Sequence, residues 1–327
     1  MRSEIVLITG GAGFIGSHLV DLWMKIGAQV IVIDDLSRGT LKNLENHLDD
    51  DSFFFIEQDL ANPKLQPALE KVLADFRPTL ILHFAAINGT EHFYDHSFQV
   101  ATTNSAVTQN IITALMVTKN SNPDWYPKFI YASTSEVYGD PDVVPTPEFA
   151  GTDIRINEKR DSYSAAKLVG EFYSKLGCEK VSVPWLILRI FNVYGPRMVS
   201  TKYGQVIPEF IQRTIDGERP LKIIGSGQHT RSFNHVSDFV SILDMLVRKN
   251  YWNEVLNIGN PNEISINDLA EKVLNSMGLP FSVEHTEARA GDHLRRCPDI
   301  TKMLDAIGGY SFRDLDDGIS ELCEFYK

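Results

Sequence analysis

The chain lacks the features that mark disulfide-rich and metal-binding proteins. It holds three cysteines in 327 residues, and Cys178, Cys297 and Cys323 are too far apart to form a Cys-x-x-Cys pair. None of the nine histidines shows the spacing of metal ligands either. We therefore expect no disulfide framework and no metal site, and this use of cysteine is typical of a reducing cytoplasm.

Basic charge and long apolar runs are also missing. The net charge is -12, whereas nucleic-acid backbones select basic surfaces, so no nucleic-acid partner is expected. The longest apolar stretch, residues 183–191, contains Arg189 and is typical of a buried strand, not a membrane span. The apolar run at residues 5–8 is too short, and too soon followed by glycines, for a signal peptide. We expect a cytoplasmic protein with no membrane partner.

What the chain does have is an alternation of two patterns. Apolar, mostly β-rich runs occupy residues 5–9, 29–34, 53–57, 80–83 and 128–132, and helical patterns lie near residues 15–26, 65–75 and 98–117. This alternation predicts a parallel sheet with helices on both faces. Right-handed crossovers then make it a Rossmann-type, doubly wound α/β fold.

The pattern of the sequence changes after about Pro196, where turns marked by glycine separate shorter strands and helices. We therefore expect a Rossmann domain over residues 1–180, with residues 181–191 adding one more strand to its sheet. A smaller C-terminal α/β lobe is expected over residues 192–327.

A glycine-rich loop near the N-terminus predicts a dinucleotide site. The segment "VLITGGAGFIGSHLV" places Gly10, Gly13 and Gly16 between a strand and a helix, with Phe14 and Ile15 among them. The first glycine allows a tight turn, the second a close approach to a diphosphate, and the third close packing of helix on strand. The N–H groups at the start of the helix then face the phosphates.

An acidic residue follows at the end of the next strand pattern, as a dinucleotide site requires. The carboxylate of Asp34 can accept hydrogen bonds from both ribose hydroxyls and would repel a 2'-phosphate, so NAD is favoured. Arg38 nearby keeps NADP open as an alternative. Asp59 and Leu60, after the third strand pattern, border the adenine in this interpretation, although Asp59 suits a plain turn equally well.

A tyrosine and a lysine form the candidate catalytic pair. In "DSYSAAKLVGE", Tyr163 and Lys167 lie four residues apart in a helical pattern, so their side chains leave the same face. An ammonium beside a phenol, with an oxidised nicotinamide nearby, stabilises the phenolate and lowers its pKa. Such a phenol can act as a general base near neutral pH. By itself the Tyr-x-x-x-Lys spacing is common on solvated helices.

Together with the glycine loop, this pair resembles the extended short-chain dehydrogenases over essentially the whole chain. Further segments match that family in order: "HFAA", "STSEVYG", "RIFNVYGPR", "TRSFNHVSD" and "NIGN". The resemblance implies an NAD cofactor, a nucleoside-diphosphate sugar as substrate and a homodimer. It places Ala85, in the first of these segments, beside the cofactor. A dinucleotide sensor without catalysis is the alternative, but it would be expected to lack Tyr163 or Lys167.

The resemblance also assigns roles in the chemistry. Tyr163 is the base, Lys167 its electrostatic partner and a ribose contact, and Thr134 a relay to the reacting hydroxyl. Asn192 and Arg231 match positions that hold the diphosphate, where an arginine offers two parallel donors.

The sugar is expected to contact two further regions. Arg289, Arg295 and Arg296 form a basic cluster, of which at least one should face the substrate. Asn88 lies in the segment "INGTEHFYDHS", which should line the sugar pocket.

Three reactions remain open. Members of this family oxidise the sugar, usually at its 4-position, and the resulting ketone permits epimerisation, decarboxylation of a uronic acid, or dehydration. The triplet Thr134-Ser135-Glu136 supplies an extra carboxylate, and with "YGPRM" and "RRCPDI" it resembles nucleoside-diphosphate glucuronate decarboxylases, in which Glu136, Ser135 and Arg296 take part. The segment at residues 87–97 lacks the proline- and serine-rich pattern expected of those decarboxylases, and "YSAAK" is closer to epimerases and dehydratases. Decarboxylation is therefore the leading expectation, with the other two retained.

Overall fold

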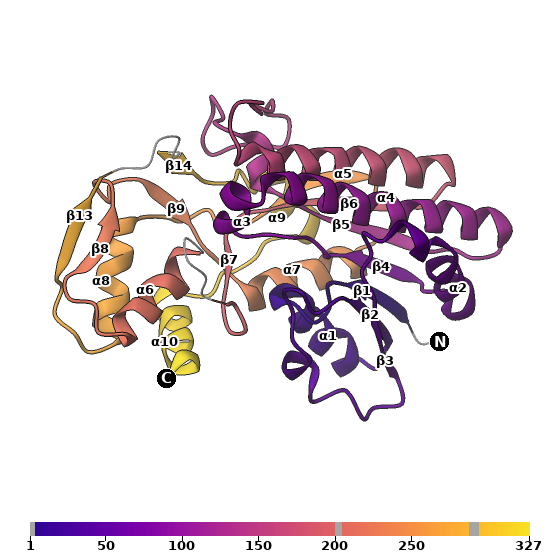
Figure 1. The fold of residues 1–327 in the computed structure, drawn as a ribbon, viewed down its shortest axis with the longest axis horizontal. Helices are drawn as coiled ribbons and strands as arrows, with labels where there is room; N and C mark the ends of the chain where they lie inside the picture. The colour runs from indigo at the N-terminus through magenta and orange to yellow at the C-terminus, as the bar shows by residue number, and fades with distance from the viewer. Residues whose placement is uncertain (1–3, 200–204, 288–293) are drawn as a thin grey trace.

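The protein, described from a computed structural model, is built on a central parallel sheet (Figure 1). The structure describes residues 4–199, 205–287 and 294–327, without the side chains of residues 90 and 91. The sheet has seven strands in the order β11-β6-β5-β4-β1-β2-β3, and every neighbouring pair is parallel. The strands are β1 (Ile5–Thr9), β2 (Gln29–Asp34), β3 (Phe53–Glu57), β4 (Leu80–His83), β5 (Lys128–Thr134), β6 (Trp185–Ile190) and β11 (Glu254–Ile258).

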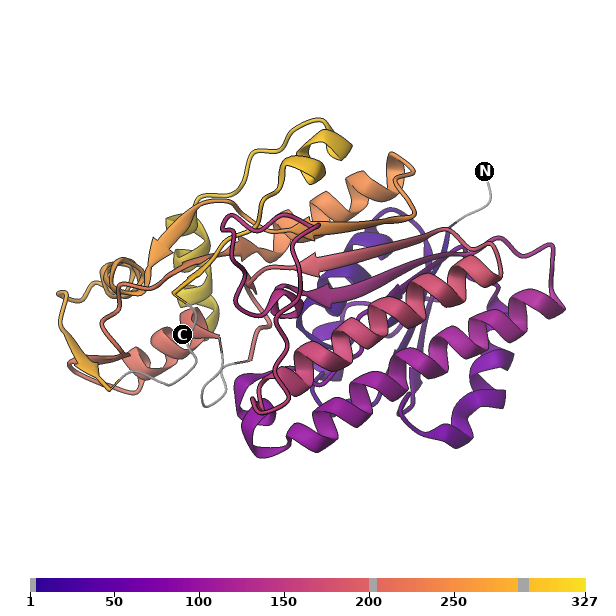
Figure 2. The same cartoon turned by 90° about the horizontal axis from the view of Figure 1, so that it is seen from above.

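Helices cover both faces of this sheet, which is why its strands consist of nearly continuous apolar runs. One face packs against α2 (Gln66–Phe76), α4 (Ser97–Ser121) and α5 (Asp161–Lys180). The other packs against α1 (Phe14–Lys25), α7 (Val236–Arg248) and α9 (Thr301–Ile307). Figures 1 and 2 show α4 and α5 running side by side as the outer layer of the first face. The predicted doubly wound Rossmann-type fold is confirmed.

A smaller lobe lies beyond one end of the sheet. Its helices α6 (Val206–Ile215), α8 (Ile266–Ser276) and α10 (Leu315–Tyr326) share one apolar core. Around them, β8 (Leu221–Ile224) pairs with β13 (Val283–Thr286), and β9 (Thr230–Ser232) pairs with β12 (Glu263–Ser265) and β14 (Arg295–Arg296). The short segments of the chain are β7 (Val193–Tyr194), β10 (Asn234–His235), α3 (Thr90–Asp95) and the 3-10 turns η1 (Leu41–Leu44), η2 (Pro63–Leu65) and η3 (Ser135–Tyr138).

The range 192–327 is shared between the two parts of the molecule. Besides the smaller lobe, it supplies β11 to the edge of the large sheet and α7 and α9 to one face. The division at residue 191 therefore stays a prediction, whereas the strand expected within residues 181–191 is present as β6.

The strand order reverses at the centre of the sheet, because β1 pairs with both β2 and β4. In a doubly wound sheet, the loops leaving such neighbouring strands turn to opposite faces and open a crevice at the carboxyl ends. The fold thus places a crevice next to the glycine loop that follows β1.

Side chains close the outer edge of β11. The Glu148 carboxylate accepts the N–H of Asn257 at 2.9 Å, and the Lys302 ammonium donates to the carbonyl of Val255 at 2.8 Å. The N–H of Asn257 and the carbonyl of Val255 are therefore already hydrogen-bonded on the outer side of β11, and the other side of the strand pairs with β6. Among the described helices, none is both long and apolar enough to cross a membrane.

Candidate active site

A cleft of about 830 Å³ lies at the crevice between the carboxyl ends of the strands and the smaller lobe. It brings together nearly all the residues expected from the sequence. These lining residues are Gly10, Gly13, Phe14, Ile15, Gly16, Asp34, Arg38, Asp59, Leu60, Ala85, Asn88, Thr134, Ser135, Glu136, Tyr163, Lys167, Asn192 and Arg231.

The glycine loop leaves no room for larger residues. Gly10 has a φ of +72°, and a Cβ there would lie 2.8 Å from the backbone nitrogen of Ala85. A Cβ on Gly16 would lie 2.1 Å from the carbonyl oxygen of Gly10. Gly13 is the N-cap of α1 and brings no side-chain hydrogen bond to its first turn. The first turn of α1 lines the cleft, and its N–H groups have no side-chain cap, as a diphosphate site requires.

Asp34 is held rigidly at the end of β2. Its two carboxylate oxygens accept the N–H of Ala12 at 3.0 Å and of Leu36 at 2.8 Å. Burial raises the pKa of Asp34, while these two hydrogen bonds lower it. A carboxylate has about four acceptor positions, so both oxygens can still accept a ribose hydroxyl. With the uncapped first turn of α1, these residues fit NAD.

The expected adenine contacts lie in the wall of the same cleft. Asp59 accepts the N–H of Ala61 at 2.8 Å, which is the local bond of a turn. Leu60 is buried, and its carbonyl accepts the side-chain amide of Asn110 at 2.7 Å.

The tyrosine that is expected to be catalytic, Tyr163, is buried on α5, beside the end of β5. The Thr134 hydroxyl accepts the N–H of Glu136 at 3.2 Å. Burial, followed by the charge of Glu136, raises the pKa of Tyr163, and the nearby hydroxyl of Thr134 lowers it. The expected lowering of this pKa is therefore not present in the protein alone. The reason is geometric, because no cation of the described residues bonds to the phenol.

The ammonium of Lys167 is directed away from the phenol of Tyr163, toward β5. Its ammonium donates to the carbonyl of Ala132 at 2.6 Å and lies 4.9 Å from the ring centroid of Tyr131. Burial lowers the pKa of Lys167 to about 7, against a rise from the charge of Glu171. The position of Lys167 in the cleft wall suits the expected ribose contact.

Glu136 lies between two arginines. One carboxylate oxygen accepts from Arg160 at 2.9 Å and also from Arg296. Arg296 is buried, donates to the carbonyl of Gly139 at 3.2 Å and is not part of the cleft wall, whereas Arg160 is. Burial lowers the pKa of Arg296, and the charge of Glu136 raises it. The carboxylate thus faces the cleft with one arginine beside it and one behind it.

The diphosphate candidates come from the loop after β6 and from β9. The amide of Asn192 donates to the carbonyl of Ser232 at 3.0 Å, and Arg231 donates to the carbonyl of Thr230 at 2.8 Å. Of the basic cluster, Arg295 forms an exposed ion pair with Glu263. Arg289 lies outside the described residues.

Two cleft residues are absent from the site expected from the sequence. The ring of Phe93, on α3, stacks on the ring of Tyr163, with centroids 4.6 Å apart and planes 22° apart. Arg160 lies three residues before Tyr163, but nothing in the sequence indicates its bond to Glu136. Both contacts join separate segments, so local patterns give no signal for them.

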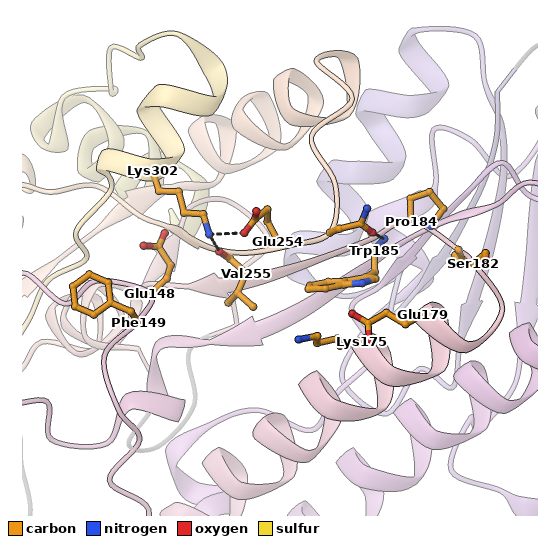
Figure 3. Close-up of a pocket in the computed structure, with 12 residues that line it drawn as sticks. Glu148, Phe149, Lys175, Glu179, Ser182, Pro184, Trp185, Glu254, Val255 and Lys302 are labelled. Atoms are coloured by element: carbon orange, nitrogen blue, oxygen red, sulfur yellow. Dashed lines mark hydrogen bonds and ion pairs between the residues drawn. The ribbon is translucent and has the colours of Figure 1, made fainter.

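A second hollow, of about 740 Å³, lies at the β11 edge of the sheet (Figure 3). Its wall includes Lys175 and Glu179 from α5, Trp185 from β6, and Lys302 from α9. None of the site residues expected from the sequence lines it, so the chemistry belongs to the larger cleft.

A glycine turn at the central crevice, an acidic residue on the next strand and a Tyr–Lys pair in the same cleft define a dinucleotide-dependent enzyme of the short-chain dehydrogenase type. The model of the NAD dependent epimerase/dehydratase family matches residues 6–259. The chain belongs to that family, and it is an enzyme with NAD as its cofactor.

Two curated relatives are decarboxylases by name. UDP-glucuronic acid decarboxylase 1 of Xenopus tropicalis is 32% identical over 322 residues, which cover 98% of this chain and 72% of the relative. UDP-N-acetyl-alpha-D-glucosaminuronate decarboxylase of Bacillus cytotoxicus is 30% identical over 338 residues, which cover 98% of this chain and 97% of the relative.

Similar solved structures carry other names. UDP-glucose 4-epimerase of Thermotoga maritima, solved with UDP-glucose, superposes with a TM-score of 0.86 at 28% identity, covering 98% of both chains. The dTDP-glucose 4,6-dehydratase of Streptomyces venezuelae, solved with NAD, has a TM-score of 0.86 at 26% identity, covering 98% of this chain and 96% of the other.

Proposed function

We propose that this protein decarboxylates a nucleoside-diphosphate uronic acid of the UDP-glucuronate type, by transient oxidation at the sugar 4-position. The observation that carries the proposal is the arrangement of Glu136 in the cleft, beside Thr134 and held by Arg160 and Arg296. An extra carboxylate with two cations is unnecessary for simple hydride exchange. The names of the two curated relatives agree with this assignment.

The first step is removal of the proton from the 4-hydroxyl of the sugar. Tyr163 accepts this proton, and Thr134, whose hydroxyl lies near the phenol, bridges to the substrate hydroxyl. When bound, NAD supplies the hydride acceptor for the 4-carbon and a positive charge that favours the phenolate. Lys167 and the uncapped first turn of α1 bind the cofactor, and Asp34 orients its ribose.

The second step is loss of carbon dioxide from the 4-keto uronate. The electron pair of the bond between C5 and the carboxylate moves toward the ketone, forming an enolate, and carbon dioxide leaves. Arg160 lines the cleft, so its guanidinium offers a positive charge to the substrate carboxylate and to the developing enolate. C5 then takes up a proton that solvent supplies through the carboxylate of Glu136, which is ionised beside its two arginines at the start and the end of the cycle. Return of the hydride to C4 reduces the ketone as Tyr163 gives its proton back to the oxygen, so the net reaction consumes one proton and releases carbon dioxide.

The nucleotide end of the substrate is assigned to Asn192 and Arg231. Both line the cleft, and the guanidinium of Arg231 offers paired donors to diphosphate oxygens. The UDP-sugars in the names of several relatives favour uridine as the base.

We also propose a cytoplasmic homodimer. The exposed side of α4 and α5 carries apolar side chains on the outer layer seen in Figures 1 and 2. They are Phe98, Val117, Val169, Phe172 and Leu176. A second copy meeting the same face would bury this surface in a four-helix contact. The three free, buried cysteines agree with a reducing compartment.

A second candidate is 4-epimerisation or 4,6-dehydration. It is favoured by the solved structures named above and by Phe93, which places a large ring in the segment where the sequence departs from decarboxylases.

Product mass after incubation of the purified protein with NAD and UDP-glucuronate tests the proposal. Loss of carbon dioxide supports it. An unchanged mass with a new sugar signal by NMR means epimerisation and rejects decarboxylation. With UDP-glucuronate unchanged, loss of water from UDP-glucose or dTDP-glucose assigns dehydration. Tyr163→Phe is the control, since any true turnover must fall with it.

A further inference from the structure

The segment between β4 and α4 is fixed at its start by a buried side chain. The Asn104 amide accepts the N–H of Ile87 at 2.7 Å and donates to the carbonyl of Ile87 at 2.9 Å. Asn104 is 1% exposed, so this pair of hydrogen bonds is protected from water. Gly89 then turns the chain with a φ of +127°, and the short helix α3 follows. The segment thus enters the cleft wall from a fixed point.

One side chain of α3 reaches the loop after β2. Nε2 of His92 lies 2.9 Å from Nη1 of Arg38. A guanidinium has donors only, so the imidazole nitrogen accepts and carries no proton there. Arg38 lies four residues after Asp34, which is assigned to the ribose. The contact therefore joins two walls of the cleft beside the ribose position.

The next residue of α3 reaches the catalytic tyrosine. Phe93 is 4% exposed and packs on Tyr163 and Val100 in one small apolar cluster. Its stacked geometry on the Tyr163 ring is a favourable arrangement for two aromatic rings. Because His92 and Phe93 are adjacent on one helical turn, a movement that opens one contact displaces the other.

We propose that α3 is a latch on the dinucleotide cleft, which couples retention of the cofactor to the placement of Tyr163. An enzyme that oxidises and then reduces the same sugar must keep its reduced cofactor throughout the cycle. The Arg38–His92 bond closes the cleft at the ribose end, and Phe93 transmits the closed position to the phenol. Arg38 and His92 are latch residues, and Phe93 is a positioning residue. The latch serves decarboxylation, epimerisation or dehydration equally.

The rate of NADH release, followed by stopped-flow fluorescence with no sugar present, tests the latch. His92→Leu and Arg38→Gln each remove one partner, and release should become about tenfold faster, as expected for a lost hydrogen bond to a charged group. The double variant should be no faster than the single ones, because both remove the same contact. His285→Leu, at an exposed histidine on β13 of the smaller lobe, is the matched control. Unchanged release in both single variants, or additive effects in the double one, overturns the latch.

The coupling to Tyr163 has its own test. Phe93→Leu keeps an apolar side chain but removes the stacked ring, so kcat should fall about tenfold with KM unchanged, and its pH dependence should shift. Phe93→Tyr should restore both, and Phe281→Leu, on an exposed residue of the smaller lobe, is the control. A loss confined to KM, or an unshifted pH profile, overturns the positioning role. Because NADH release needs no sugar, failure of the proposed reaction leaves the latch test intact.

Discussion

The carboxylate of Glu171 raises the pKa of the Lys167 ammonium, which lies one turn away on α5, against a larger lowering from burial. The balance is a pKa of about 7, well below the value near 10.4 of a lysine in an unfolded chain. Lys167 therefore changes charge in the range where the enzyme is expected to work.

This pKa has a consequence for stability. Between pH 7 and 10 the unfolded chain binds a proton on this lysine that the folded chain does not, so the free energy of unfolding rises with pH there, by at most about 1.4 kcal/mol per unit. Below pH 7 the folded chain carries Lys167 in its charged form, and the full loss of stability from burying that charge is present. Lys167→Met should remove this pH dependence, measured by urea unfolding of the protein without NAD. Lys175→Met, on an exposed turn of α5, should keep it. Equal slopes in wild type and Lys167→Met would contradict a depressed pKa.

Glu136→Gln should separate oxidation of the sugar from completion of the catalytic cycle. We expect steady-state decarboxylation to fall about 100-fold or more, because the carboxylate that passes a proton to C5 is gone. Oxidation at the 4-position continues, so the absorbance of reduced cofactor should accumulate with UDP-glucuronate. Glu45→Gln, on the exposed surface, should behave as wild type. A decarboxylation rate unchanged in Glu136→Gln would remove this residue from the chemistry.

Gly16→Ala should abolish NAD binding. The added Cβ would meet the carbonyl oxygen of Gly10 at 2.1 Å, and relief of this clash moves α1 away from the loop that holds the diphosphate. Gly151→Ala is the matched control, because a Cβ there meets nothing within 4 Å. Isothermal titration with NAD is the measurement, with circular dichroism to verify folding. Normal binding by Gly16→Ala would mean that the helix and strand need not pack this closely.

Phe172→Glu should convert the dimer into a monomer. Phe172 is 58% exposed on α5, and a carboxylate there would be buried without a partner if a second copy met this face. The measurement is the mass by light scattering at a fixed concentration. Phe281→Glu, an exposed position on the smaller lobe, should leave the mass unchanged. A monomeric wild type at working concentrations would reject the dimer itself.

The ends of the strands show what the sequence could predict. The first four strands match the predicted bounds. Strands β1, β2 and β4 are almost entirely buried and are therefore continuous apolar runs, and β3, half-buried at the edge of the sheet, is apolar over residues 53–56. Strand β5 continues for two residues beyond the predicted Ala132, through Ser133 and Thr134. These two are polar because they carry bonds of the site, so the pattern of hydrophobicity ends before the strand does.

The residues of the site also fall into two groups, those predictable from local spacing and those brought together only by packing. The glycine loop and the Tyr163–Lys167 pair are local patterns and were predictable from their spacing. The contacts of Glu136 join residues 24 and 160 positions away in the chain, and the Phe93–Tyr163 stack joins α3 to α5. A spacing rule has no access to such contacts, since they depend on how the elements pack. The expected lowering of the Tyr163 pKa also depended on a positive charge beside the phenol. In the protein alone, burial raises that pKa instead.

The side chains along β11 also influence how copies of the chain can meet. An unprotected outer strand invites a strand of another molecule to add to it, and repeated addition leads to open fibres. Here Glu148 and Lys302 already bond the edge groups of Asn257 and Val255, and both are charged. Strand addition at this edge is therefore discouraged, whereas the proposed contact through the helical face would join two copies and then stop growing.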